Sequence, residues 1–274
     1  MLRRVPRFLS DDLKRSARDG RFIGRMGLRW AAPCLAAALV LGSGLLPARA
    51  VTGGRDDSAS GLARAAVMVL SSRGGVCSGV VLAPRIILTA GHCAAGPAEH
   101  RVHFRDEAGQ PVLLPLAGTA VHPGYDAGAI AARRRSIDLA LLRLAEPLPA
   151  RFAAAALSEE MPRAGTRLTL GGYGLARPGD ARSSGTFRTA ALPVVEPHGQ
   201  SRILVWLKDT GDPVGACEGD SGGPIAAETR IVAVTTWASG AKGCGGFSQG
   251  VLLGPQRAWI DRIAAEWGVA VRWE

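Results

Sequence analysis

The chain has 274 residues, of which 47% are hydrophobic and 20% charged, with 36 Gly, 17 Pro and 5 Cys. This composition excludes a disordered tail, a collagen-like chain and a disulfide-dense miniprotein, and it suits one large or two small domains. The net charge is +10, but residues 1–50 hold ten Lys/Arg and three Asp/Glu, whereas the remaining 224 residues hold 23 and 20. Because the excess charge lies in the leader, no nucleic-acid partner is expected.

The leader, residues 1–50, is typical of a secretory signal peptide. Arg25 and Arg29 precede the apolar run Trp30–Leu46, and Ala48-Arg49-Ala50 follows it. A basic segment, an apolar segment and an A-x-A site together predict cleavage after Ala50 and a secreted protein, extracellular or periplasmic.

Two alternatives remain for this leader. The stretch before Met26 is long for a signal peptide, so residues 1–25 are interpreted as a candidate mis-assigned start. The apolar run is also about the minimum length that spans a bilayer, so an uncleaved leader would tether the protein to a membrane. Pro33, Gly42 and Gly44 interrupt the run and favour cleavage, after which no stable membrane association is expected.

After the leader, the sequence predicts an all-β protein with one helix. Short apolar or alternating runs recur between Gly, Pro, Asp and Ser residues, a pattern typical of β-sandwiches and barrels. The predicted strands are Val67–Leu70, Val80–Leu82, Ile86–Leu88, Val112–Leu116, Leu139–Leu144, Leu168–Leu170, Leu192–Val195, Ile203–Val205 and Ile231–Val234. A helix near the C-terminus, ended by Gly268, is predicted from apolar residues at helical spacing, namely Trp259, Ile260, Ile263 and Ala264.

Three segments stand out for their chemistry. They are Leu88–Cys93 (LTAGHC), Ser136–Leu142 (SIDLALL) and Cys217–Pro224 (CEGDSGGP). Alone, each is more often a packing, metal-binding or turn feature. Together, their His92, Asp138 and Ser221 follow the chain order of one protease class. A serine hydroxyl needs an adjacent base to act as a nucleophile, and that base needs an orienting carboxylate.

On these residues, the chain resembles the chymotrypsin/trypsin-like serine proteases over nearly all of residues 51–274. Further similar segments are Val51–Gly54, Val121–Tyr125, Ala164–Thr166, Gly172–Gly174, Thr236–Ala238 and Arg257–Trp267. The resemblance implies two six-stranded antiparallel β-barrels, with the active site in the cleft between them and a short C-terminal helix. Residues 51–160 would form the N-terminal barrel with His92 and Asp138, and residues 161–274 the C-terminal barrel with Ser221.

The resemblance also implies a function and a mechanism. The protein would be a secreted serine endopeptidase of the simpler bacterial type, acting as a monomer on protein or peptide substrates without metal or cofactor. Ser221 would attack the scissile carbonyl, His92 would take its proton and pass it on, and Asp138 would orient His92. The backbone amides of Gly219 and Ser221 would form the oxyanion hole.

Four cysteines of the mature chain allow three pairings. The family pattern implies Cys77–Cys93, beside the catalytic histidine, and Cys217–Cys244, at the walls of the specificity pocket. Such bonds fit an exported protein.

The specificity pocket implied by the family departs from that of trypsins. Gly215, followed by Ala216, stands where trypsins have an aspartate, so a cationic substrate side chain would lack a buried counter-charge. Gly250 would keep one wall open, and Ala238 would narrow the other. Thr236 and Trp237 complete the predicted substrate-binding strand, and the Thr236 hydroxyl would hold the catalytic aspartate. Cleavage after medium to large uncharged apolar residues is therefore predicted.

Two charged residues are predicted to tune this preference. Glu218 at the pocket entrance would disfavour acidic substrate residues, and Arg135 would favour an acidic residue further back in the substrate. The alternative for Arg133–Arg135 is a solvated surface loop.

The mature N-terminus is predicted to complete the active site. In family zymogens, a cut frees an α-ammonium that pairs with the aspartate before the catalytic serine, here Val51 and Asp220. Ala50 precedes the cut, so signal peptidase alone would release and activate the protein. The alternative is cleavage elsewhere in Leu46–Arg55, followed by trimming by a second protease.

A different functional class is a catalytically silent relative that acts as a binding protein, since a fold does not determine a function. The intact His92, Asp138 and Ser221 argue against it, because silent relatives usually lose one of the three.

Overall fold

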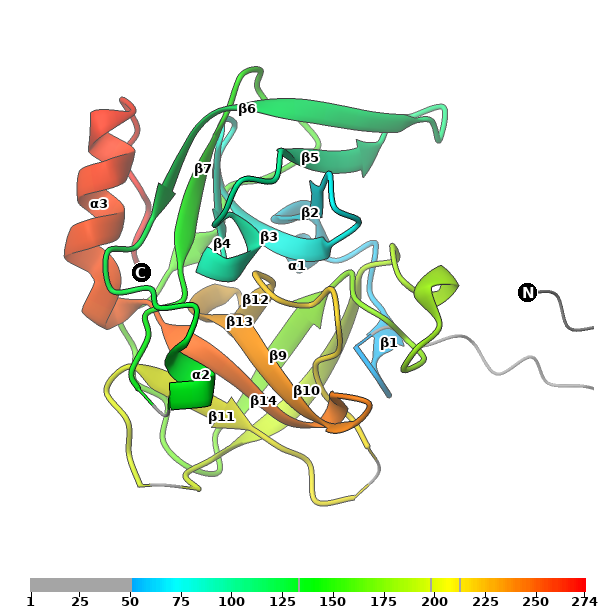
Figure 1. The fold of residues 1–274 in the computed structure, drawn as a ribbon, viewed down its shortest axis with the longest axis vertical. Coiled ribbons are helices and arrows are strands. Elements are labelled where there is room, and N and C mark those ends of the chain that lie inside the picture. Colours follow the sequence, from blue (N-terminus) through cyan, green and yellow to red (C-terminus); the bar gives the residue numbers. More distant parts are fainter. Residues whose placement is uncertain (1–50, 133, 198, 212) are drawn as a thin grey trace, which may run out of the picture. The chain divides into compact units, whose positions relative to one another are not determined.

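The computed structural model describes residues 51–132, 134–197, 199–211 and 213–274. The predicted signal peptide lies outside these residues. Within them, no helix is both long enough and apolar enough to cross a membrane. Figure 1 shows two groups of strands, one above the other, with a helix along one side.

The first barrel closes six antiparallel strands in the order β2-β3-β4-β7-β6-β5. Alternate, mostly aliphatic residues of these strands fill its interior, among them Val69, Ile87 and Leu142. The strands are β2 (Ala66–Ser71), β3 (Val76–Ala83), β4 (Ile86–Thr89), β5 (His100–Arg105), β6 (Pro111–Val121) and β7 (Ala140–Leu144).

The second barrel closes through β9-β10-β11-β14-β13-β12 and back to β9, again with antiparallel neighbours. Two short strands join its edges: β1 (Arg55–Asp56) pairs with β10, and β8 (Ala156–Leu157) lies parallel to β13. The barrel strands are β9 (Arg167–Gly172), β10 (Arg188–Val195), β11 (Leu204–Leu207), β12 (Pro224–Ala227), β13 (Arg230–Ala241) and β14 (Cys244–Leu252). The prediction of two six-stranded barrels is confirmed.

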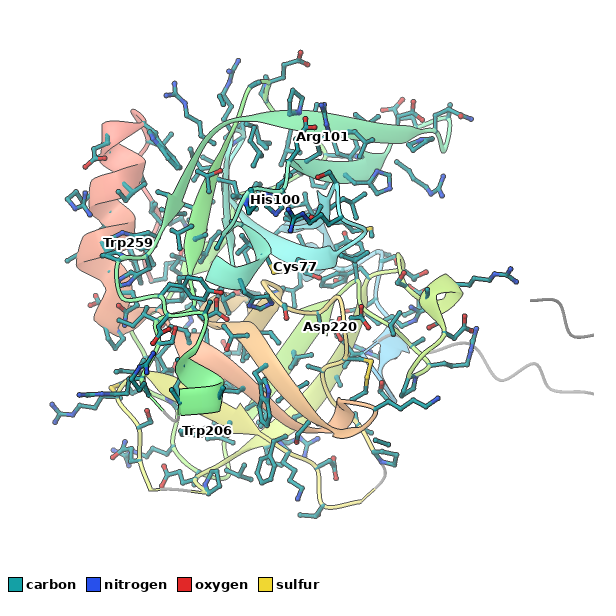
Figure 2. All side chains as sticks on the ribbon, in the orientation of Figure 1. Cys77, His100, Arg101, Trp206, Asp220 and Trp259 are labelled. Atoms are coloured by element: carbon teal, nitrogen blue, oxygen red, sulfur yellow. A yellow bond between two sulfur atoms is a disulfide. The ribbon has the colours of Figure 1, made fainter. Side chains whose placement is uncertain are left out.

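The C-terminal helix α3 (Arg257–Glu266) joins the two barrels. Its apolar face packs in one cluster with Leu82 and Leu141 of the first barrel and with Ile231 and Val251 of the second. Trp259, labelled in Figure 2, also stacks edge-on against His122. The predicted helix is confirmed, and Gly268 beyond its end has the positive φ of +77° that suits a helix C-cap. The described residues also form two single-turn α-helices, α1 (Gly61–Arg64) and α2 (Ala129–Ala132). Three 3₁₀ turns are present as well: Gly91–Cys93, Ala181–Ser183 and Gly254–Gln256.

Three barrel strands, β5, β12 and β14, were absent from the sequence prediction. β5 has the sequence HRVHFR, which carries only two apolar residues, and β14 contains three glycines. β12 begins at Pro224 and is only four residues long. Each strand is formed by pairing with neighbours on both sides, a tertiary effect that local composition does not report.

Candidate active site

His92 lies in a 3₁₀ turn, Gly91–Cys93, which directly follows β4 of the first barrel. All four residues of β4 are buried, so the turn begins from a fixed point at the end of the barrel. The side chain of His92 is 38% exposed and lines a cavity of about 1030 Å³.

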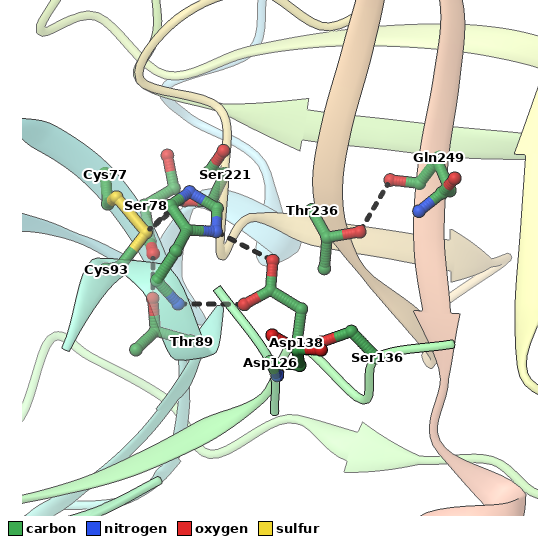
Figure 3. A network of polar contacts seen from close by, with 11 residues as sticks. Cys77, Ser78, Thr89, Cys93, Asp126, Ser136, Asp138, Ser221, Thr236 and Gln249 are labelled. Atoms are coloured by element: carbon green, nitrogen blue, oxygen red, sulfur yellow. Dashed lines mark hydrogen bonds and ion pairs between the residues drawn. A yellow bond between two sulfur atoms is a disulfide. The ribbon is translucent and has the colours of Figure 1, made fainter. Parts of the chain in front are cut away.

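Asp138 comes from the loop between α2 and β7 and meets His92 through both of its carboxylate oxygens (Figure 3). Oδ2 lies 2.7 Å from His92 Nδ1, and Oδ1 accepts a hydrogen bond from the His92 backbone N–H at 2.8 Å. These two contacts fix the ring orientation and leave Nε2 directed elsewhere. The arrangement suits a base that is oriented by a carboxylate.

Ser221 belongs to the second barrel and lies in the turn before β12. It lines the same cavity as His92 and Asp138, so the structure brings all three residues together. Cys93 Sγ lies 3.6 Å from His92 Nε2 and 3.8 Å from the Ser221 carbonyl oxygen. Among the described residues, no hydrogen bond joins Ser221 Oγ to His92, a contact that often forms only when substrate is bound.

The turn that carries Ser221 is held from the first barrel. The backbone N–H of Ser78 in β3 donates to the Ser221 carbonyl at 2.7 Å, and Ser78 Oγ donates to the Gly219 carbonyl at 2.9 Å. Gly219 has a φ of +96°, a backbone conformation that disfavours any residue with a side chain. Within the described part of the chain, neither the Gly219 nor the Ser221 amide donates a hydrogen bond, so both are available to a ligand.

Asp220, between these two amides, is fully buried near the centre of the molecule (Figure 2). Its carboxylate accepts hydrogen bonds from the backbone N–H groups of Gly174, at 2.8 Å, and Cys217, at 2.9 Å. Burial raises the pKa of Asp220 to about 7, although the two amides and the charge of Arg188 oppose this shift. No residue of the described chain forms an ion pair with it within 4.0 Å.

Both predicted disulfides are present. Cys77–Cys93 ties the His92 turn to β3, and Cys217–Cys244 ties the segment before Ser221 to β14. Donor atoms of Cys77, Cys93 and His92 lie within 4.8 Å of one another, as in a metal site. However, both sulfurs are consumed by the disulfide and cannot act as thiolate ligands.

The structure changes part of the predicted specificity pocket. Ala216, Thr236, Trp237 and Ala238 line the cavity, as do Glu218 and Arg135, but Gly215 and Gly250 do not. A Cβ at Gly215 would lie 2.8 Å from Ser248 Oγ, so this position is covered. A Cβ at Gly250 would lie 2.5 Å from Ile225 Cδ1, so Gly250 faces the core of the second barrel and not the cavity. The prediction of Gly250 as a cavity wall is therefore corrected.

Several residues of the cavity had no signal in the sequence. Gln249 lines it and accepts a hydrogen bond from Trp206 Nε1 at 3.2 Å. Thr236 Oγ1 donates to the Gln249 carbonyl at 3.5 Å, as Figure 3 shows, and not to Asp138, the partner predicted for it. Because Gln249 and Trp206 come from paired strands β14 and β11, only the strand register could have revealed them.

Val51 and the residues after it dock onto the segment before Ser221. Val51 is completely buried and belongs to the same apolar cluster as Leu168 and Ala216. Thr52 forms a β-bridge with Gly215, whose N–H donates to the Thr52 carbonyl at 3.0 Å. This contact brings the predicted mature N-terminus to the same part of the second barrel as Asp220.

Comparisons with known proteins agree with this geometry. A sequence model of the family described as Trypsin matches residues 52–256. Trypsin iota of Drosophila melanogaster is 28% identical over 181 residues, which cover 59% of this chain and 68% of that protein. Vitamin K-dependent protein C of Mus musculus is 26% identical over 237 residues, which cover 76% of this chain. The match spans only half (50%) of the length of that relative. The structure of neuropsin, a serine protease expressed in the limbic system of mouse brain, is similar with a TM-score of 0.65 at 19% identity, over 78% of this chain and 99% of that one.

Proposed function

Because this chain belongs to the trypsin family of serine endopeptidases, we propose that it hydrolyses peptide bonds through Ser221, His92 and Asp138. The observation that carries the proposal is the double contact of Asp138 with His92, in a cavity that also contains Ser221. The Nδ1 contact leaves Nε2 as the atom of His92 that can take a proton from the serine.

The reaction would proceed through an acyl-enzyme. Ser221 Oγ attacks the carbonyl carbon as its proton passes to His92 Nε2, and the carbonyl oxygen becomes an oxyanion. The free amides of Gly219 and Ser221 donate to that oxyanion. The C–N bond then breaks, the amine takes the proton from His92, and a water molecule repeats the sequence to release the acid. Asp138 stabilises the imidazolium that forms in each half.

The substrate preference that we propose rests on the absence of a charge at the position of Gly215. Neither Gly215 nor the Ser248 hydroxyl that covers it supplies an anion, so a lysine or arginine side chain would lose its hydration without compensation. Uncharged apolar residues before the scissile bond are therefore favoured. Arg135 also lines the cavity and would favour an acidic residue further back in the substrate.

The proposed mature N-terminus is Val51, released by cleavage of the leader as the protein is exported. Val51 has a φ of +45°, a left-handed conformation that is a genuine outlier for a β-branched residue. Cleavage of the bond before Val51 removes the carbonyl group that makes this conformation unfavourable, and so releases the strain. The freed α-ammonium would then pair with Asp220, in keeping with the docking of Thr52 on Gly215.

Two experiments test these proposals. Ser221→Ala should lower kcat for a peptide or ester substrate by several orders of magnitude without changing the thermal unfolding midpoint. Hydrolysis by this variant at the wild-type rate would refute the assignment of Ser221. If the wild-type protein itself shows no hydrolysis, the binding-protein alternative stands. Terminal sequencing of the exported protein should find Val51 first in an active chain. A longer, inactive form that needs a second protease would contradict the activation proposal.

A further inference from the structure

Arg188 is a charged residue in a row of β10 that otherwise faces the core of the second barrel. Ala190, Leu192 and Val194 follow it at alternate positions and belong to that core. Because side chains alternate between the two faces of a strand, Arg188 lies on the same inner face. It is only 6% exposed. Arginine is almost never buried to this extent without an anion to compensate its charge.

Hydrogen bonds do not account for the burial of Arg188. Among the described residues its Nε has no partner, and its one side-chain bond is from Nη1 to the Thr186 carbonyl at 3.5 Å, a long and weak contact. No carboxylate oxygen of the described chain lies within 4.0 Å of the Arg188 guanidinium, the distance that defines an ion pair. Any anion that compensates this charge within the described chain therefore lies beyond the distance of a direct ion pair.

The strand register places a buried carboxylate on the same face as Arg188. Arg188 is paired directly with Gly172 of β9, and residues directly opposite in an antiparallel pair project to the same face. A Cβ at Gly172 would overlap Asp220 Oδ1. The carboxylate of Asp220 thus occupies the space that a side chain at position 172 would take, next to the position of the Arg188 side chain.

The electrostatics of this pair agree with the register. Arg188 lowers the pKa of Asp220 against the effect of burial. Burial has the largest effect on the pKa of Arg188 and lowers it. Of the nearby charges, Asp56 raises this pKa, Arg177 lowers it, and Asp220 raises it. Asp56 faces Arg188 from β1, but it is an exposed residue, so its charge is screened by water. Asp220 is the buried anion of the group and is screened least.

We propose that Arg188 is a positioning residue of the protease: its buried guanidinium is the internal counter-cation of Asp220 while Val51 is still joined to Ala50. This inference rests on the proposed function, in which a freed Val51 amine would be a second cation for the same carboxylate. The ionised Asp220 holds the Gly174 and Cys217 amides, and with them the turn from Gly219 to Ser221. The uncut chain therefore has a basal activity that depends on Arg188.

The test is the rate at which a fluorophosphonate labels Ser221 in the 274-residue chain, with mass spectrometry confirming that the Ala50–Val51 bond is intact. At about pH 8, Arg188→Gln, which keeps a polar side chain but removes the charge, should slow labelling by about tenfold or more. Arg188→Lys should restore most of the rate. Arg182→Gln removes an exposed charge from the same region and should stay within about twofold of wild type.

A second measurement separates charge compensation from ordinary packing. Arg188→Gln should lower the thermal unfolding midpoint of the wild-type chain and change it much less in an Asp220→Asn background, because a neutral amide needs no counter-cation. The same cycle is informative if Arg188→Gln alone fails to fold. In that case, restored folding of the double variant with Asp220→Asn would support the pairing of Arg188 with Asp220.

Several outcomes would overturn the inference. They are unchanged labelling of Arg188→Gln, a lysine variant as slow as the glutamine variant, and an equal loss of stability in both backgrounds. If the intact chain is not labelled but a chain cut before Val51 is, the role of Arg188 is wrong and the proposed function stands. If neither chain is labelled, the proposed function fails as well.

Discussion

The two barrels hold their parts of the site by different means. In the first barrel, His92 follows the buried strand β4 and forms a direct contact of 2.7 Å with Asp138. In the second, Ser221 adjoins the fully buried Asp220, which has hydrogen bonds from two amides but no ion pair within the described chain. The three buried side-chain atoms without a hydrogen-bond partner among the described residues all belong to the second barrel or to the segment docked on it: Thr52 Oγ1, Arg188 Nε and Thr235 Oγ1.

This difference indicates which half of the site depends on chemical conditions. Apolar packing and a formed hydrogen-bonded pair need nothing further, so the His92–Asp138 half is preorganised. A buried carboxylate is stable only with a compensating charge, so the Ser221 half depends on ionisation and on the state of the N-terminus.

The largest effect is expected in the preorganised half. Asp138→Asn should lower kcat by about 10⁴-fold, because an amide favours the wrong tautomer of His92 and cannot stabilise the imidazolium. The thermal unfolding midpoint should change little, since the Asp138 side chain lies at the cavity and only its hydrogen bonds change. Steady-state kinetics and calorimetry check the two expectations, and a variant as active as wild type would remove Asp138 from the mechanism.

The turn that follows the nucleophile should be the most sensitive to added volume. Gly222 has a φ of +84°, and a Cβ there would overlap the Ser78 carbonyl and Thr89 Oγ1. Gly222→Ala combines backbone strain with overpacking and should cost about 4 kcal/mol of unfolding free energy. Gly61→Ala is the matched control in denaturant unfolding. Gly61 has an ordinary φ, and the nearest atom to an added Cβ belongs to the Arg64 side chain, at the ordinary contact distance of 3.8 Å. Equal stability of the two variants would contradict the close packing of the turn.

The ionisation of Asp220 should appear in the pH dependence of stability. Its pKa is about 7 in the folded chain, above the unfolded value, so the folded state binds a proton that the unfolded state has released. This contribution is complete below about pH 4 and is lost as the pH rises to about 7. The unfolding free energy of the uncut chain should therefore decline over this interval, and Asp220→Asn should flatten the decline. A decline of equal size in that variant would assign it to another group.

The smallest effect concerns substrate choice. Library profiling should find uncharged apolar residues before the cut and an acidic residue further back. Arg135→Ala should weaken only the acidic preference, by about twofold to fivefold, because an exposed charge contributes little. Dominant cleavage after arginine or lysine would contradict the proposed preference for uncharged residues.

Local patterns in the sequence predicted most of the fold and the central residues of the site. The apolar runs of β2, β3 and β4 and the helical spacing of α3 are local signals, because each pattern lies within a single element. The segments around His92, Asp138 and Ser221 were found from their residue types and chain order. The strands β5 and β14, the inward direction of Gly250 and the access of Gln249 to the cavity depend on strand pairing and register, which no local pattern reports.

The buried position of Arg188 was hidden for the same reason. In the sequence it is one of many arginines, and only its pairing with Gly172 brings it beside Asp220.

The assignment of Ser221 as the nucleophile is tested most directly by adduct mapping. The exported protein is treated with a fluorophosphonate, digested, and the modified peptide is identified by mass spectrometry. If Ser221 is the nucleophile, we expect one adduct, on Ser221, with loss of activity in proportion to labelling and no adduct on a His92→Ala variant. An adduct on another residue, or full activity in a protein labelled at Ser221, would contradict it.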